Sequence, residues 1–268
     1  MVEYGDPGRH VTTLNVILIG AGRGNRLMPL TEIEPKPFAV IAGKRILDWS
    51  LDAFRENGLD RFVFIAGYLQ EVVRREYPGF TFVENAQWRD NNILFSLMCA
   101  RQYLGDGFYG TYTDTLYRGG AVRALRDSPH DITLVMDTRW RDRYRFRSQH
   151  PESDGEKMQA VGGLVTRVSR EIVPEDASGE FTGVFRMTAR GAAQFLDFHD
   201  GLLASLGSEG AIADGRPFRM AYMIHQLDAM IRSGIKVHCV SVPGDYHEVD
   251  TLEDYDLAAG DWTRFAKE

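Results

Sequence analysis

The sequence predicts a single-domain α/β protein in which a mixed, mostly parallel sheet lies between two layers of helices. Over residues 14–135, strand-sized apolar segments alternate with helix-spaced segments, which is the rhythm of right-handed β-α-β units. Of the 268 residues, 44% are hydrophobic and 26% are charged, the balance of a folded chain rather than a disordered one. Because no low-complexity linker divides the chain, we expect one domain over residues 1–268, a Rossmann-like three-layer αβα sandwich.

The first half of the chain is expected to hold five strands and three helices. Residues 14–19 are mostly apolar and β-branched, as in a strand that is buried on both faces. The segment 46–57 carries Leu47, Leu51 and Phe54 at helical spacing and ends before Gly58, a typical helix C-cap. The same criteria predict strands at 61–66, 81–83, 110–113 and 131–136, and helices at 69–77 and 91–104.

The second half is less regular. Strands are expected at 158–168, 179–187 and 236–242, and helices at 189–206 and 220–233, before a terminal helix that begins near Leu252. Ligands of doubly wound sheets bind beyond the carboxyl ends of the strands. Functional residues are therefore expected in the turns that follow strands.

Composition and charge exclude several classes of protein. The net charge of −7 argues against non-specific nucleic-acid binding, and no apolar run approaches the roughly 18–20 residues of a membrane span. The N-terminus lacks the basic-then-apolar layout of a secretory signal. Two cysteines, Cys99 and Cys239, indicate neither a disulfide framework nor a metal cluster, and we expect both thiols to be buried. These features favour a cytoplasmic enzyme without nucleic-acid or membrane partners.

A glycine-rich turn directly after the first strand is the strongest chemical signal. Gly20, Gly22 and Gly24 fall within five positions, so backbone N–H groups can approach an anion closely. Arg26 and Lys36 add positive charge. Only five of the 31 basic residues are lysines, which makes the choice of lysine at position 36 informative. The pattern indicates a phosphate loop, with an ordinary glycine-rich turn as the alternative.

Two better-known phosphate loops do not fit this segment. The dinucleotide pattern G-x-G-x-x-G meets Asn25 at its third glycine, and Pro29 interrupts the helix that should follow. A Walker loop requires Gly-Lys-Ser/Thr, but Gly43-Lys44 is followed by Arg45. The loop therefore needs a different explanation.

A longer pattern around the loop carries a family resemblance. Residues 20–31 read GAGRGNRLMPLT and residues 35–37 read PKP. This combination resembles the signature of the nucleotidyltransferases that make nucleotide-activated sugars, phosphocholine and phosphonates. Further motifs of that family follow in order: Gly67-Tyr68, Asn91-Asn92-Ile93, Ser96-Leu97 and Glu248-Val249-Asp250-Thr251. The resemblance covers residues 14–258.

Several segments from residue 112 onward look like cytidylyltransferases of phosphonate biosynthesis. The segments are 112–117, 135–140, 150–151, 156–157 and 179–183, while 91–97 is similar to phosphocholine cytidylyltransferases. The resemblance implies a nucleotide-diphospho-sugar transferase-like fold, with a nucleotide-binding half at 14–135 and an acceptor-binding half at 136–258. It also implies transfer of CMP from CTP to a small phosphonate or phosphate monoester, with Mg²⁺ as cofactor. Arg139 is a departure, because those relatives often carry aspartate there.

The implied reaction requires carboxylates that face the glycine loop. An anionic acceptor oxygen needs no general base, but two polyanions repel each other unless a divalent metal and fixed cations lie between them. Asp114, after the 110–113 strand, matches the family's metal aspartate, and Asp250 is the second candidate. Asp250 or Thr251 could instead cap the terminal helix, with Thr251 and Asp254 as a capping-box-like pair.

The resemblance also implies roles for the remaining candidates. The nucleotide-binding residues would be Gly20, Ala21, Gly22, Gly24, Tyr68, Asn92, Ser96 and Thr113. The catalytic cations would be Arg26, Lys36 and Lys157, and the acceptor-binding residues Asp137, Arg139, His150 and Glu180. From the residues alone, Lys157 could also be a solvated surface lysine, and Asp137 a helix cap or loop residue.

Several alternatives stay open. The segment 139–147 interleaves arginines with aromatic residues, which suits an acceptor pocket, a solvated or dimer-interface segment or, less readily in an acidic protein, nucleic acid. Within the family, the alternative is a sugar-1-phosphate nucleotidyltransferase. Outside it, an NAD-dependent oxidoreductase or a non-catalytic nucleotide-binding regulator would also need a phosphate loop. The sequence leaves a homodimer open.

Overall fold

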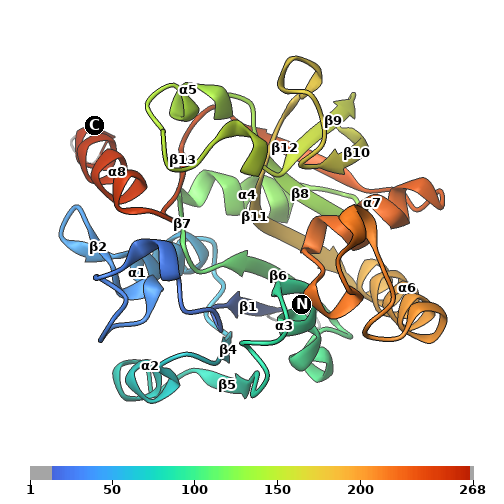
Figure 1. Cartoon of the computed structure of the whole chain (residues 1–268), viewed down its shortest axis with the longest axis horizontal. Coiled ribbons are helices and arrows are strands. Elements are labelled where there is room, and N and C mark those ends of the chain that lie inside the picture. The colour runs from blue at the N-terminus through green and yellow to red at the C-terminus, as the bar shows by residue number, and fades with distance from the viewer. Residues whose placement is uncertain (1–13, 266–268) are drawn as a thin grey trace, which may run out of the picture.

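The computed structural model describes residues 14–265, which form a central sheet with helices packed on both sides (Figure 1). The sheet has nine strands in the order β5-β4-β1-β6-β11-β8-β12-β10-β9. Its strands are β1 (Asn15–Ile19), β4 (Phe62–Ala66), β5 (Thr81–Glu84), β6 (Gly107–Tyr112), β8 (Ile132–Asp137), β9 (Lys157–Val161), β10 (Leu164–Ser169), β11 (Gly179–Thr188) and β12 (His238–Val242). Two short pairs stand apart, β2 (Val40–Ile41) with β3 (Lys44–Arg45), and β7 (Thr115–Tyr117) with β13 (Tyr246–Glu248).

Eight α-helices occur within residues 14–265. They are α1 (Ile46–Arg55), α2 (Gln70–Glu76), α3 (Ile93–Cys99), α4 (Gly119–Asp127), α5 (Trp140–Tyr144), α6 (Ala189–Leu206), α7 (Met223–Arg232) and α8 (Leu252–Phe265). None of these helices is long and apolar enough to cross a membrane.

The first half of the sheet is parallel, as the β-α-β rhythm predicts. β1 pairs in parallel with β4 and β6, and β4 with β5. The side chains of β1 alternate between two cores: Val16 and Leu18 pack with α1, α2 and α4, whereas Ile17 and Ile19 pack with α3, α6 and α7. A strand between two helical layers must be apolar on both faces, which explains the composition of residues 14–19.

The second half is largely antiparallel, unlike the expected mostly parallel sheet. β11 runs antiparallel to β6, β8 and β9, and β10 runs antiparallel to β9 and β12. β8 and β12 are parallel. The β9–β11 pairing closes a ring of five strands, β11-β8-β12-β10-β9. The sheet is therefore mixed, and parallel pairing dominates only in its first half.

Several element boundaries differ from the sequence prediction. The strand expected at 158–168 is split between β9 and β10, because Gly162 and Gly163 take φ values of +57° and +82° and reverse the chain. The helix expected at 91–104 ends with α3 and is followed by a separate 3-10 turn at Arg101–Tyr103. The helix expected at 220–233 begins only at Met223. The short elements β7, β13, α4 and α5 had no predicted counterpart.

The prediction of buried thiols is wrong. Cys99 is exposed at the end of α3, and Cys239 on β12 is only half-buried. Both are free cysteines.

Candidate active site

A cavity of about 350 Å³ lies beyond the carboxyl ends of β1 and β6, beside the glycine turn. Most of the predicted site residues line it: Gly20, Ala21, Gly22, Gly24, Arg26, Lys36, Asn92, Ser96, Thr113, Asp114 and Asp250. This is the place where parallel sheets bind ligands. The cavity therefore combines the phosphate loop with both predicted metal aspartates.

The three glycines of the turn have different surroundings. A Cβ on Gly20 would lie 2.6 Å from the Phe64 ring and 2.8 Å from the Thr113 hydroxyl, so the turn packs too closely for any side chain. Gly24 takes φ +69° and lies against the methylenes of Lys36. A Cβ on Gly22 would meet no atom within 4 Å. Gly22 is thus the position where the protein leaves room next to the backbone.

Lys36 joins the two aspartates. Its Nζ donates to Asp114 Oδ2 at 2.6 Å and to Asp250 Oδ1. Arg26 contacts the other oxygen of Asp250 and also Asp154. Asp114 and Asp250, far apart in the sequence, therefore meet beside the glycine turn on one buried ammonium group.

These contacts fix the charges of the site. Burial opposes the positive charge of Lys36, but Asp114 and Asp250 raise its pKa above the ordinary value. Burial alone would raise the pKa of Asp250, but Lys36 and Arg26 hold it well below its usual range. The ammonium and the carboxylate therefore both stay charged at neutral pH.

The β7–β13 pair brings the two aspartates together. Asp114 lies in the turn between β6 and β7, and its carbonyl oxygen accepts the Val249 N–H at 2.9 Å. β13 runs antiparallel to β7 and ends at Glu248, so Asp250 follows just beyond the end of this strand. Neither strand was predicted, because each has only three residues and the pairing is long-range.

The start of α8 holds Asp250 in place. Asp254 Oδ2 accepts the backbone N–H groups of Asp250 at 3.1 Å and Thr251 at 3.0 Å, and Thr251 Oγ1 accepts the Asp254 N–H at 3.1 Å. The predicted Thr251–Asp254 capping pair is confirmed. It caps the helix without the Asp250 side chain, which is left to contact Lys36.

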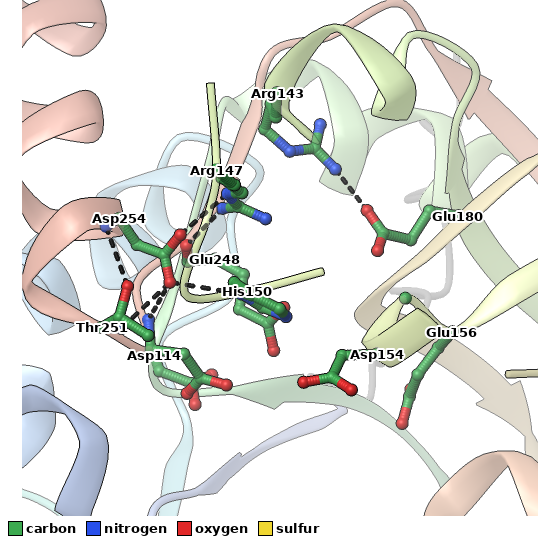
Figure 2. A network of polar contacts seen from close by, with 12 residues as sticks. Asp114, Arg143, Arg147, His150, Asp154, Glu156, Glu180, Glu248, Thr251 and Asp254 are labelled. Atoms are coloured by element: carbon green, nitrogen blue, oxygen red, sulfur yellow. Dashed lines mark hydrogen bonds and ion pairs between the residues drawn. The ribbon is translucent and has the colours of Figure 1, made fainter. Parts of the chain in front are cut away.

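His150 belongs to the same polar network (Figure 2). Its Nδ1 lies 3.2 Å from Asp254 Oδ2, and its Nε2 lies 3.6 Å from Glu248 Oε2. Arg147 contacts the second Asp254 oxygen at 2.8 Å. Burial opposes protonation of His150, but the Asp254 hydrogen bond and the Glu248 charge raise its pKa above the ordinary value. His150, predicted to bind the acceptor, thus ties Glu248 to the start of α8.

The cavity contains groups that fit a divalent cation. Asp114 Oδ1 is buried and has no hydrogen-bond partner among residues 14–265, which leaves one carboxylate oxygen for another ligand. Ligand atoms of His150, Glu248 and Asp250 also lie within 4.8 Å of one another. Carboxylate oxygens are the groups that Mg²⁺ prefers. Glu248 was missed as a candidate, although it stands in the quoted 248–251 motif.

Two predicted acceptor ligands contact a buried arginine instead. Arg143 forms ion pairs with Asp137 and Glu180, and the Tyr144 hydroxyl donates to Glu180 at 2.6 Å. Asp137 is fully buried and also accepts the Arg139 N–H at 2.8 Å. These contacts favour the loop role of Asp137 over acceptor binding. Sequence reasoning missed Arg143, which was one arginine in a segment with several.

Arg139 lies outside the cavity of Asp114. Its side chain pairs with Asp142 and lines a second cavity of about 280 Å³ with Phe146 and His247. The expectation that Arg139 binds the acceptor is therefore not supported by its position.

Lys157 and Tyr68 also differ from their predicted settings. Lys157 is buried, and its Nζ donates to the carbonyl oxygens of Glu152 at 3.0 Å and Gly155 at 3.2 Å. Burial lowers its pKa, so the surface-lysine interpretation is wrong. The Tyr68 hydroxyl donates to the backbone oxygens of Thr31 and Glu32. Tyr68 is not part of the cavity wall and holds the loop that follows the glycines.

Taken together, the fold and the site define an α/β protein that receives a polyanion beside a glycine turn and holds paired carboxylates next to it. Residues 16–178 match the MobA-like NTP transferase domain, and the chain belongs to this family. It is therefore a nucleotidyltransferase, which removes the support for an oxidoreductase.

Three relatives illustrate the similarity. The CTP:phosphoglutamine cytidylyltransferase of Campylobacter jejuni is 22% identical over 254 residues, 91% of this chain and 98% of that protein. The 2-aminoethylphosphonate cytidylyltransferase of Lancefieldella rimae is 30% identical over 103 residues, 37% of this chain and 42% of that protein. The solved structure of the CTP:phosphocholine cytidylyltransferase from Streptococcus pneumoniae has a TM-score of 0.68 at 22% identity, covering 92% of this chain and 97% of that one. The likeness to this structure shows a shared fold.

Proposed function

We propose that this chain is a Mg²⁺-dependent cytidylyltransferase that transfers CMP from CTP to a small phosphonate or phosphate monoester and releases pyrophosphate. The observation that carries the proposal is the placement of Lys36 between Asp114 and Asp250 at the glycine turn. A buried cation between two carboxylates, next to the backbone of a glycine turn, suits a triphosphate and its counter-ion. We assign nucleotide binding to residues 14–135 and acceptor binding to residues 136–258.

The reaction joins an acceptor oxygen to the α-phosphorus of CTP. As that P–O bond forms, the bond from the α-phosphorus to the bridging oxygen of the β-phosphate breaks, and pyrophosphate leaves with the electron pair. The acceptor oxygen is already anionic at neutral pH, so no proton has to be removed. The loop amides orient the phosphates, while Lys36 and Arg26 offset the negative charge that builds up during transfer. Repulsion, rather than a lack of nucleophilicity, is what these residues overcome.

Asp114 and Asp250 would hold the Mg²⁺, with Glu248 beside them. The unpartnered Asp114 Oδ1 supports this assignment. When bound, Mg²⁺ supplies positive charge that screens the phosphates from each other and from the carboxylates.

The acid-rich surroundings favour an acceptor that also carries a cationic nitrogen. Figure 2 draws Glu156 and Glu248 together with Asp114, whose charge acts on both of them. Burial raises the pKa of Glu156 to about 7, and burial together with neighbouring carboxylates raises that of Glu248 to about 8. A cation from the acceptor would relieve this excess of negative charge. Two of the relatives are named for 2-aminoethylphosphonate and phosphocholine.

The test is pyrophosphate release with four nucleoside triphosphates and a panel of acceptors. We expect turnover with CTP, and higher kcat/KM for 2-aminoethylphosphonate than for ethylphosphonate, which has the same phosphonate but lacks the amine. Turnover with glucose 1-phosphate and none with phosphonates would favour the sugar-1-phosphate alternative. Binding of CTP without pyrophosphate release from any acceptor would favour a non-catalytic regulator.

A further inference from the structure

Thr31 ends the GAGRGNRLMPLT segment at residues 20–31 but lies behind the cavity wall. It is 1% exposed and is not one of the residues that line the cavity. Its hydroxyl donates to the Gly24 carbonyl oxygen at 3.0 Å, seven residues earlier in the chain. The Leu27 N–H donates to the same oxygen at 3.1 Å. A carbonyl oxygen has two acceptor positions, so both positions on Gly24 are used within the loop.

The direction of the Gly24 carbonyl determines the direction of the next N–H group. Within residues 14–265 only the Met28–Pro29 peptide is cis, so the peptide between Gly24 and Asn25 is trans. In a planar trans peptide, the C=O and the N–H point to opposite sides. Because the carbonyl faces the buried Thr31, the Asn25 N–H faces away from it. Gly24 and Asn25 themselves line the cavity.

The backbone conformation at this peptide suits an anion. Gly24 is left-handed, with φ +69° and ψ +52°, and the 3-10 turn Asn25–Leu27 follows directly. A left-handed residue beside a right-handed one turns successive N–H groups to one side and forms a concave anion site. The same turn carries Arg26, which contacts Asp250, and Gly24 packs against the methylenes of Lys36. The orientation of one peptide therefore affects the loop amides and both neighbouring cations.

Tyr68 holds both ends of this loop. Its backbone N–H donates to the Ala21 carbonyl oxygen at 2.9 Å, at the beginning of the loop. Its hydroxyl contacts the carbonyl oxygens of Thr31 at 2.9 Å and Glu32 at 3.0 Å, at the end. Tyr68 thus fixes the backbone of Thr31, and the Thr31 hydroxyl fixes Gly24.

We propose that Thr31 is a positioning residue for the triphosphate: its hydroxyl holds the Gly24–Asn25 peptide with the N–H toward the phosphates and the carbonyl oxygen away from them. Without this hydroxyl, only the Leu27 N–H opposes rotation of the peptide, and rotation would place an oxygen against the phosphates. Neither Thr31 nor Tyr68 would touch the nucleotide. The inference rests on the proposed function, because it assumes that the cavity receives a triphosphate, but it does not depend on the identity of the base.

The experiment compares T31V with T31S in the whole chain. Valine keeps the branched shape and loses the hydroxyl, whereas serine keeps the hydroxyl and loses a buried methyl group. With Mg²⁺ present, we expect T31V to bind CTP and inorganic tripolyphosphate about tenfold or more weakly in calorimetry, as for loss of a hydrogen bond to a charged group. T31S should bind both ligands like the wild type, although its Tm should fall because of the lost methyl group. A merely structural threonine would make affinity follow Tm in both variants.

Two further variants complete the test. T182V is the matched control, because it makes the same change at a buried threonine outside the cavity wall, whose hydroxyl donates to the Val135 carbonyl oxygen at 3.2 Å. It should leave both affinities unchanged. Y68F removes the hydroxyl that holds the Thr31 backbone and should weaken both ligands by a smaller factor than T31V. If T31V does not fold, Y68F decides.

The outcomes separate this inference from the proposed function. Wild-type affinities in folded T31V, or equal weakening in T31V and T31S, would overturn the role of Thr31. If T31V does not fold, wild-type affinities in Y68F would overturn it. A wild-type protein that binds tripolyphosphate but releases pyrophosphate from no nucleoside triphosphate would instead overturn the proposed function.

Discussion

Asp114 is the residue on which the site depends most directly. It contributes one oxygen to Lys36 and keeps the other unpartnered and buried. We expect D114N to lower kcat for pyrophosphate release roughly 100-fold or more, because a neutral amide is a poor ligand for the divalent cation that stabilises the transition state. The matched control is D52N, the same change at a surface aspartate that pairs with Lys44. Wild-type turnover in D114N would remove Asp114 from the site.

Glu156 gives a pH-dependent prediction. Burial raises its pKa from 4.5 to about 7, against the opposing charge of Arg170. The folded state therefore holds a proton that the unfolded state has released between these pH values, so the stability present below about pH 4.5 is lost as pH rises to about 7. This loss is at most about 3 kcal/mol. Denaturant unfolding from pH 5 to 8 should show a smaller loss for E156Q, which cannot ionise.

The control for this pH prediction is Q159E, a glutamate placed at a half-buried strand position on the same β9. The free energy of unfolding of Q159E should fall with pH as in the wild type, with no additional loss, because a partly exposed carboxylate is solvated. Identical slopes for wild type and E156Q would show that Glu156 ionises normally in the folded protein.

The sequence identified single site residues correctly where a motif specified both the residue type and its place in the fold. Lys36, Asp114 and Asp250 could be found because each follows a turn or strand end and matches a long pattern. Asp137 and Lys157 matched the pattern equally well, yet their side chains bond to Arg143 and to backbone carbonyls. Burial and partners decide such cases, and both depend on chain segments that are distant in sequence.

At the scale of elements, the glycine turn can be divided into packing and binding positions. G20A should destabilise the fold, because its Cβ would lie 2.6 Å from Phe64, whereas G22A should fold normally because its Cβ meets no atom within 4 Å. A methyl group at position 22 would, however, occupy the side from which phosphates approach. We expect G22A to keep its Tm and lose roughly tenfold or more in CTP affinity, measured by calorimetry. Unchanged CTP affinity in folded G22A would place the phosphates elsewhere.

Long, locally determined elements were predicted well. The 189–206 helix was predicted to its ends. In the structure, Thr188 caps it by accepting the Gly191 N–H at 3.2 Å, and it ends before Gly207. By contrast, β7 and β13 are strands only because they pair with each other, with the register Tyr246↔Tyr117 and Glu248↔Thr115. Pairing between short segments far apart in the chain leaves no periodicity to find. The site depends on this unpredictable pair, since it brings Asp250 to Asp114.

At the scale of the whole molecule, the two halves follow different rules. Parallel β-α-β units can be recognised from alternating strand and helix segments, and β5, β4, β1 and β6 pair in parallel as that alternation predicts. The five-strand ring of the second half is closed by β9 pairing with β11, a contact between edges that no local pattern specifies. The half with the phosphate loop was therefore the predictable one, and the half assigned to the acceptor was not.

The joint dependence of the site on nucleotide and metal should appear in the stability of the entire chain. A ligand present at about 100 times its Kd stabilises the native state by about 2.7 kcal/mol, which for a chain of this length raises Tm by roughly 5–10 °C. We expect CTP with Mg²⁺ to reach this range, and CTP with EDTA to give far less, because the triphosphate would then face Asp114, Asp250 and Glu248 without a metal between them. In D114N, the Mg²⁺-dependent part of the shift should disappear, and the EDTA value should rise because one of the repelling carboxylates is then neutral. Equal shifts with Mg²⁺ and with EDTA in the wild type would mean that Lys36 and Arg26 alone neutralise the triphosphate, and that the two aspartates serve to hold those cations rather than a metal.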